Sequence, residues 1–230
     1  MTLVIIFPLL LVILIGTYSY LVLGSVFYLM INSAITLLFA IYLAIRLYYY
    51  QNLIARKRFM FSFIELFILN FDVQKSIEAT MAIIFPLFSA TEQKTLNRLQ
   101  KGDGLSLVEQ LKLYFNDYYY ESFFDMLMVV VDRGGSFIKV SEVLLYTISD
   151  SEAQLIKLNR IDNTYLIKFV FNWLFIMAVA VIFRFALNDT INLNNLDLTY
   201  LVGNEIFMGT FLLSLTLLIE NRLRRSKNVT

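Results

Sequence analysis

Residues 1–45, MTLVIIFPLLLVILIGTYSYLVLGSVFYLMINSAITLLFAIYLAI, contain no charged side chain and decide the fold. As a single helix this stretch would be about 67 Å long, roughly twice the hydrocarbon thickness of a bilayer. It must therefore fold back on itself, and Gly24-Ser25 is the hinge that divides it evenly. The sequence predicts one membrane span near Leu3–Leu23 and a second near Val26–Tyr48.

Two later apolar runs, Tyr165–Leu187 and Tyr200–Ile219, are each about long enough to cross a bilayer. The chain is therefore predicted to have four spans. Arg184 and Glu205 lie near the outer ends of these runs. Because a charge inside hydrocarbon is costly, we expect both side chains to extend to the interface.

The positions of Lys and Arg predict the orientation. They flank the middle of the chain and follow the last span, at Arg46, Arg56, Lys57, Arg58, Lys157, Arg160, Lys168, Arg222, Arg224, Arg225 and Lys227. The loop 188–199 has none. Because cytoplasmic loops are enriched in Lys and Arg, we expect the middle and both termini in the cytoplasm, in a multi-pass protein of the inner or plasma membrane. The first run lacks a basic start and a cleavage site, which predicts an uncleaved span.

Composition restricts the chemistry. The chain has no Cys and no His, which excludes disulfides, thiolate nucleophiles, imidazole catalysis and the usual zinc or haem ligands. A net charge of +1 argues against a nucleic-acid partner, which needs clustered Lys and Arg. The basic residues beside the spans are explained by topology and membrane lipid. We expect no catalytic residues, no metal and no cofactor.

The polar middle of the chain predicts a small cytoplasmic domain over residues 51–163, between span pairs in residues 1–50 and 164–230, the last with a short basic tail. Its patterning is helical throughout, which predicts an all-α bundle of about six helices. The expected helices cover 58–70, a helix capped by Asp72 and ending before Pro86, one capped by Thr91 and ending at Lys101, one opened by Ser106, then 121–132 and 136–162.

Two turns carry the most specific signal. Gly104–Leu111, GLSLVEQL, resembles a turn and helix of the F-domain family of type II secretion and type IV pilus platforms. Gly134–Val140, GGSFIKV, resembles the second signature of that family, and Asp72–Glu78, DVQKSIE, resembles its opening helix. The arrangement of two spans, one such domain and two spans is similar to the platform subunits of tight-adherence pili.

The resemblance implies a non-enzymatic membrane platform for a type IV-like pilus. A hexameric cytoplasmic secretion ATPase would drive it, pilin or prepilin subunits would be its cargo, and a second F-domain protein or another copy of the chain would pair with it. The residues that carry the family signatures are Gly102, Gly104, Ser106, Leu107, Glu109, Leu111, Gly134 and Gly135. The solvated residues expected to contact the ATPase are Glu109, Lys112, Lys139 and Glu142.

Other patterns have structural explanations. The four glycines are expected to end helices with positive φ, and no phosphate-binding lysine follows Gly102-x-Gly104. Glu121 and Asp125, four apart, are expected to form a solvated face rather than a cation site. Tyr118–Tyr120 fits a docking patch and a half-buried junction equally well, and Tyr48–Tyr50 fits an aromatic belt. Asn172 and Trp173 fit helix packing better than the handling of a pilin helix.

Two other function classes compete with the platform. One is an integral membrane enzyme or transporter using Asp or Glu chemistry, which would place acidic groups at the membrane face or at the bilayer midplane. The first two spans have none, and the acids of the middle segment are dispersed. The other is a platform of DNA-uptake or conjugation machinery, which shares the mechanism and differs in cargo.

The charge distribution generates a topology prediction. A reporter fused after Lys227 or inserted near Lys101 should be cytoplasmic, and one placed near Asn194 should be external, because the basic residues lie on one side of the predicted spans. Enzymatic reporters active on only one side of the membrane measure this. A cytoplasmic signal at Asn194 would refute the orientation.

Overall fold

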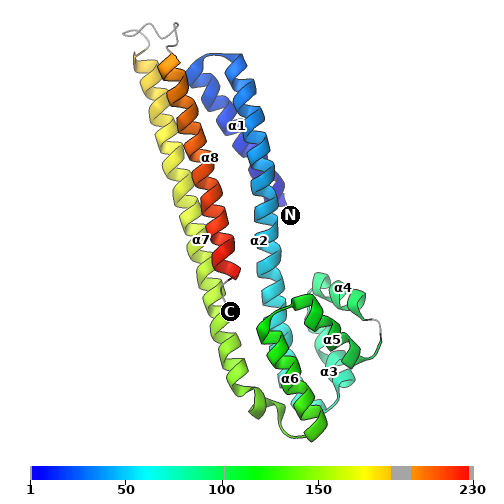
Figure 1. The fold of residues 1–230 in the computed structure, drawn as a ribbon. Helices are drawn as coiled ribbons and strands as arrows, with labels where there is room; N and C mark the ends of the chain where they lie inside the picture. The colour runs from blue at the N-terminus through cyan, green and yellow to red at the C-terminus, as the bar shows by residue number, and fades with distance from the viewer. Residues whose placement is uncertain (1, 101, 188–197, 228–230) are drawn as a thin grey trace. The chain divides into compact units, whose positions relative to one another are not determined.

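The structure is a computed structural model that describes residues 2–100, 102–187 and 198–227 (Figure 1). Over these residues it is all-helical, with no strand, and four helices are long and apolar enough to cross a membrane. This confirms the prediction of an all-α protein with four helices that could span a membrane. The elements are α1 (Thr2–Leu23), α2 (Val26–Gln74), α3 (Ile77–Ile84), the 3-10 turn η1 (Phe85–Leu87), α4 (Ala90–Leu99), α5 (Gly104–Phe115), α6 (Tyr118–Arg133), α7 (Phe137–Leu187) and α8 (Leu198–Lys227).

The chain divides into two compact units. The span unit comprises residues 1–51 and 158–227, and the middle unit comprises residues 52–157. Helices α2, of 49 residues, and α7, of 51 residues, each contribute to both units without a break. Separate helices had been predicted on either side of residues 163–164, but no Gly or Pro stands there to stop α7, and it continues to Leu187.

In the span unit, α1 and α2 form the predicted hairpin. Gly24 has a φ of +66°, a conformation that favours glycine, and its N–H donates to the carbonyl of Tyr20 over 2.8 Å. Helices α7 and α8 pack through aromatic rings: the Trp173 ring lies 5.0 Å from that of Phe207 and 5.1 Å from that of Phe211. Trp173 is thus a packing residue, as expected, whereas its neighbour Asn172 is exposed.

The core of the middle unit is aromatic. The part of α2 after the predicted second span buries Phe59, Phe63 and Phe67 completely or nearly so, and residues 58–70, predicted as a helix, continue α2 without a break. These rings meet Phe88, which follows η1, and rings of α5 and α6, namely Phe115, Tyr120 and Phe123. Phe137 of α7 joins the cluster through the ring of Phe123. Each fully buried phenylalanine stabilises the fold by about 1.5–3 kcal/mol, so α2 holds the unit together.

The tyrosine run at the start of α6 is a buried junction. Tyr119 and Tyr120 are buried, and only Tyr118 is exposed. The Tyr120 hydroxyl donates to the carbonyl of Val108 over 2.9 Å, and the Tyr119 and Ser151 hydroxyls lie 2.8 Å apart. The run therefore ties α6 to α5 and α7, and only Tyr118 is accessible to a partner.

Asp72 does not cap α3, as the sequence had suggested. It lies in the last turn of α2, and the helix stops at Lys75, which has a φ of +54°. The N-cap of α3 is Ser76, whose Oγ accepts from the N–H of Ala79 over 3.4 Å. The prediction failed because Asp72 and Ser76, four residues apart, are both good capping residues. Asp72 binds Ser136 and Phe137 instead, which leaves Ser76 to cap α3.

The predicted starts of α4 and α5 were also wrong by two or three residues. Ser89, not Thr91, caps α4, because Ser89 and Glu92 bond reciprocally in a capping box. Asp103, not Ser106, caps α5, and its Oδ1 accepts from the Ser106 N–H over 2.9 Å. In both cases a capping side chain further upstream satisfies the free N–H groups of the first turn.

The glycine predictions are partly correct. Gly134 (φ +73°) and Gly135 (φ +118°) have positive φ after α6, as expected. Gly102 and Gly104 have not, so they are not left-handed caps. Gly104 is instead a point of close approach, because a Cβ there would lie 3.0 Å from Cγ2 of Ile77 on α3.

Because of this difference, replacing Gly134 by alanine should cost more stability than the same change at Gly102. Gly134→Ala should lower the free energy of unfolding by about 1–3 kcal/mol, because φ +73° with ψ −178° is a region populated almost only by glycine. Gly102→Ala should change it by less than about 0.5 kcal/mol, because the added Cβ meets only Ser106 at 3.4 Å or more. Thermal unfolding of the full chain in detergent measures both, and equal melting temperatures would refute the account of this turn.

Candidate functional site

A polar network centred on Asp72 joins the end of α2 to the start of α7. Asp72 Oδ1 accepts from the backbone N–H of Phe137 over 2.8 Å, and Oδ2 accepts from the Ser136 hydroxyl over 2.8 Å. The Lys75 ammonium lies 2.7 Å from Asp72 Oδ1 and donates to the carbonyl of Gly135 over 3.2 Å. We call these five residues the Asp72 clamp. It caps α7 with a carboxylate supplied by another helix.

The clamp favours the ionised carboxylate. The hydrogen bonds from Lys75 and Ser136, and to a lesser extent that from the Phe137 N–H, lower the pKa of Asp72 to about 2, although burial opposes them. Because the pKa in the folded chain lies below the ordinary value of 3.8, the stabilisation is complete above about pH 4. It is lost as the pH falls toward 2.

The two family-like signatures occupy different places in the middle unit. In the first, Gly104, Leu107 and Leu111 are buried on α5, whereas Glu109 is exposed. The second, Gly134–Val140, contains three of the five clamp residues and places Phe137 in the core, with its ring 5.5 Å from that of Phe71. Only the second signature therefore takes part in the polar network that joins α2 to α7.

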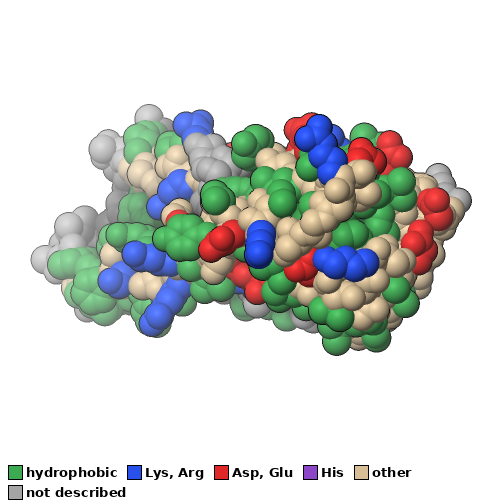
Figure 2. Space-filling model, turned by 90° about the horizontal axis from the view of Figure 1, so that it is seen from below, with side chains coloured by type: hydrophobic (Ala, Val, Ile, Leu, Met, Phe, Trp, Pro, Cys, Tyr) green, Lys and Arg blue, Asp and Glu red, His purple; other side chains and the backbone are tan. Residues whose placement is uncertain are grey.

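The predicted partner-contact residues separate into free and engaged groups. Glu109, Lys139 and Glu142 are exposed. Lys112 is half-buried, with its ammonium 3.3 Å from the Glu121 carboxylate and 3.7 Å from that of Asp125. Glu121 and Asp125, which were expected to form a solvated face, therefore share Lys112 as a partner. Among the described residues no three metal-ligating side chains come together. Figure 2 shows acidic, basic and apolar side chains interspersed over one face.

Glu205 is hydrogen-bonded to another helix within the span unit. Its Oε1 accepts from Asn32 Nδ2 over 3.0 Å, and the same amide group donates to the Ser19 hydroxyl over 3.0 Å. This network links α8, α2 and α1. The neighbouring Asn204 is buried, and its amide has no hydrogen-bond partner among the described residues, nor has Nη1 of Arg184.

A second polar cluster joins α7, α8 and α2 near the other end of the spans. The Arg222 guanidinium donates to the side-chain carbonyls of Asn159, over 2.9 Å, and Asn163, over 2.5 Å, and lies 4.1 Å from the centre of the Tyr50 ring. Arg225 pairs with the buried Asp162 over 2.6 Å. Sequence reasoning explained these arginines by topology alone. The spacing of Asn159, Asp162 and Asn163, which share one helix face, was the signal for their partners.

These features define an all-helical protein with four apolar helices suited to a membrane and a small helical unit between them. Comparisons of the chain with protein-family models, curated proteins and solved structures found no match. The likeness to the F-domain family stays a prediction from the two signatures.

The clamp generates a test with a pH signature. Asp72→Ala should lower the free energy of unfolding by about 1–2 kcal/mol, the usual cost of removing a capping carboxylate. Asp72→Asn should keep an acceptor for the Phe137 N–H but lose the ion pair with Lys75. Thermal unfolding of the full chain between pH 6 and pH 2.5 measures both variants.

The native chain should lose more stability than Asp72→Asn as the pH falls below about 4, because only the native carboxylate takes up a proton there. Asp132→Ala is the matched control, since Asp132 is exposed in the last turn of α6. Parallel pH profiles of the native chain and Asp72→Asn would show that the ionised clamp does not stabilise the fold.

Proposed function

We propose that this protein is a membrane platform that couples a cytoplasmic secretion ATPase to the insertion of pilin subunits into a type IV-like filament. The observation that carries the proposal is the continuity of α2 and α7, each of which is one unbroken helix with residues in both units. The choice of a type IV-like filament rests on the signature glycines and the sequence resemblance. In this proposal the protein catalyses no reaction.

The mechanism follows from where the two long helices end. A partner that pushes or rotates the middle unit acts on α2 and α7 together, because the Asp72 clamp fixes the end of one to the start of the other. The motion travels along hydrogen-bonded helices, which do not stretch, into the residues of the second and third spans. Asn32 on α2 and Asn159 on α7 then pass it to α8 through Glu205 and Arg222.

The exposed charges of the middle unit are the proposed contact surface for the ATPase. The proposed surface consists of three exposed residues, Glu109 on α5 and Lys139 and Glu142 on α7. Lys112 is left out of it because its ammonium pairs with the Glu121 carboxylate. Charged rims of this kind govern the rate and the specificity of association more than its affinity. A platform for DNA uptake would use the same surface and differ only in cargo.

The alternative, a transporter or membrane enzyme with carboxylate chemistry, is favoured by one observation. Glu205 is a partly buried carboxylate among the apolar helices, and ionisable groups in such places commonly mark ion or proton paths. Its hydrogen bond to Asn32 also has a simpler explanation, as a link between helices. Activity of the purified chain separates the two.

Affinity purification of the full chain from membranes, with mass-spectrometric identification, tests the platform. We expect a secretion ATPase and prepilin-like proteins to be recovered with the native chain. The triple variant Glu109→Lys, Lys139→Glu, Glu142→Lys should recover at least several-fold less ATPase with an unchanged melting temperature, because exposed substitutions usually cost within about 0.5 kcal/mol.

Lys94→Glu on α4 is the control, because it reverses a charge that is also exposed, at a residue outside the proposed surface. Recovery of ATPase that is insensitive to the triple variant would remove the proposed surface. ATP hydrolysis or ion flux by the chain alone in liposomes, abolished by Glu205→Gln, would replace the platform by the transporter or enzyme.

A further inference from the structure

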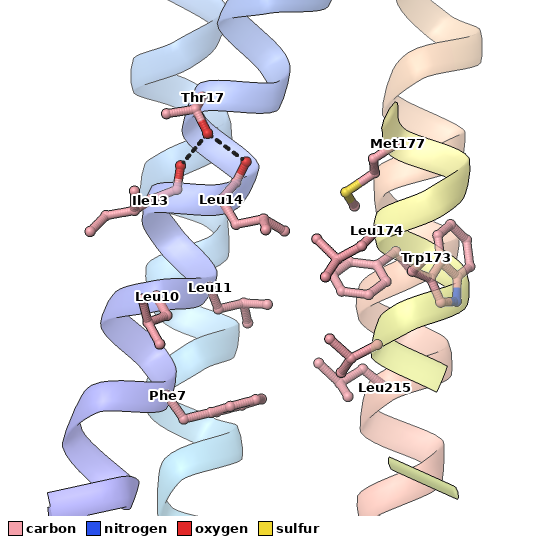
Figure 3. A pocket seen from close by; sticks show the side chains of 12 residues that line it. Phe7, Leu10, Leu11, Ile13, Leu14, Thr17, Trp173, Leu174, Met177 and Leu215 are labelled. Carbon is pink, nitrogen blue, oxygen red and sulfur yellow. Dashed lines mark hydrogen bonds between the residues drawn. The ribbon is translucent and has the colours of Figure 1, made fainter. Parts of the chain in front are cut away.

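An apolar groove runs between α1 and the α7–α8 pair within the span unit. Figure 3 shows the side chains of Leu11 and Leu14 pointing toward that of Leu174 across it. Its volume is about 450 Å³. Residues from three helices line it, among them Leu10 and Leu14 of α1, Trp173 and Leu174 of α7, and Phe211 and Leu215 of α8.

The groove offers an occupant few hydrogen-bonding groups. Thr17 is the one hydroxyl-bearing residue in its lining, and its Oγ1 lies 2.8 Å from the Ile13 carbonyl and 3.0 Å from that of Leu14. The hydroxyl proton is therefore used within α1 itself. Apart from the indole N–H of Trp173, the remaining lining side chains are apolar, so the groove suits a hydrocarbon occupant over most of its length.

The dimensions of the groove fit one hydrocarbon chain. On α1 it extends from Phe7 to Thr17, which is about 15 Å of helix and about half the hydrocarbon thickness of a bilayer. One leaflet accounts for half of the hydrocarbon thickness, so the groove is about as long as one lipid tail. A helix that crosses the bilayer would extend over about 30 Å, twice the length of the groove.

The surroundings supply that chain. The helices that form the groove are those suited to span a membrane, so the groove opens onto lipid tails. An empty apolar space costs the contacts that its lining atoms would otherwise make, and a neighbouring tail can restore them. We propose that the groove between α1 and α7 is a binding site for one acyl chain of a membrane phospholipid, which is held there longer than the lipids around the protein.

The chain contains its own reporter for this site. Trp173 is the single tryptophan and lines the groove, where its ring is held against Phe207 and Phe211. Bromine atoms on a lipid tail quench tryptophan fluorescence at contact. The experiment titrates the purified, delipidated full chain in detergent with a phosphatidylcholine whose tails are brominated, and excites the indole beyond the absorption of tyrosine.

We expect quenching to saturate at a single phospholipid per chain and to be reversed only slowly by excess unbrominated lipid. The double variant Leu10→Phe, Leu174→Phe adds two rings to the groove and should raise the lipid concentration at half-saturation roughly tenfold or more. Leu38→Phe is the matched control: Leu38 is 71% exposed on α2 and does not line the groove, so its titration should match that of the native chain.

Two results would overturn the site. One is quenching that rises only in proportion to the mole fraction of brominated lipid, or that the double variant leaves unchanged, because either describes ordinary surrounding lipid. The other is protection of Trp173 that disappears when a dimer dissociates, which would assign the groove to a second copy of the chain. Equal melting temperatures of the double variant and the control show that the variant has folded.

Discussion

The length of α2 and α7 is the constraint on which the rest of the structure depends. At 1.5 Å per residue their 49 and 51 residues extend about 75 Å, whereas the hydrocarbon of a bilayer is about 30 Å thick. A helix of this length that spans a bilayer would pass from lipid to water without a break. The side chains of α2 change in the same way along its length, because α2 has no charge before Arg46 and buries a row of phenylalanines after it. Polar contacts such as Arg46–Glu220 and Arg222–Asn159 gather where the composition changes.

The two units are stabilised by different forces. In the middle unit, water drives the rings around Phe63 and Phe67 together, and the buried aromatic area provides most of the stability. Between apolar helices in lipid this force is absent, because lipid tails are as apolar as leucine. Association of such helices must then be stabilised by packing and by hydrogen bonds between them. The contact of Asn32 with Glu205 and Ser19 is such a bond, and it links three of the four spans.

This difference also explains what the sequence could predict. The four apolar helices were placed correctly, because burying a charge in hydrocarbon is so costly that long uncharged runs favour helices that could span a membrane. Helix starts were less certain, because Asp72 and Ser76 are both good caps and only the long-range bond to Phe137 assigns Asp72 to α7. Pairs as distant as Asn32 and Glu205 leave no local pattern. The glycine pair 134–135 was predictable because positive φ is a local demand, whereas the role of Gly104 depends on a neighbouring helix.

The groove limits how a platform of this design could handle a subunit. Helix α1 is tied to α2 through Ser19 and packs on α8 through the rings of Tyr18 and Phe207, while α7 packs on α8 through Phe169 and Phe211. The space that these contacts leave between α1 and α7 extends along α1 from Phe7 to Thr17, about 15 Å, which is half the length that a helix crossing a bilayer would need. A pilin helix would therefore have to pass along an outer face of the span unit. Force applied to α2 and α7 would then act on the cargo from the side, with the lipid-filled groove as part of the wall.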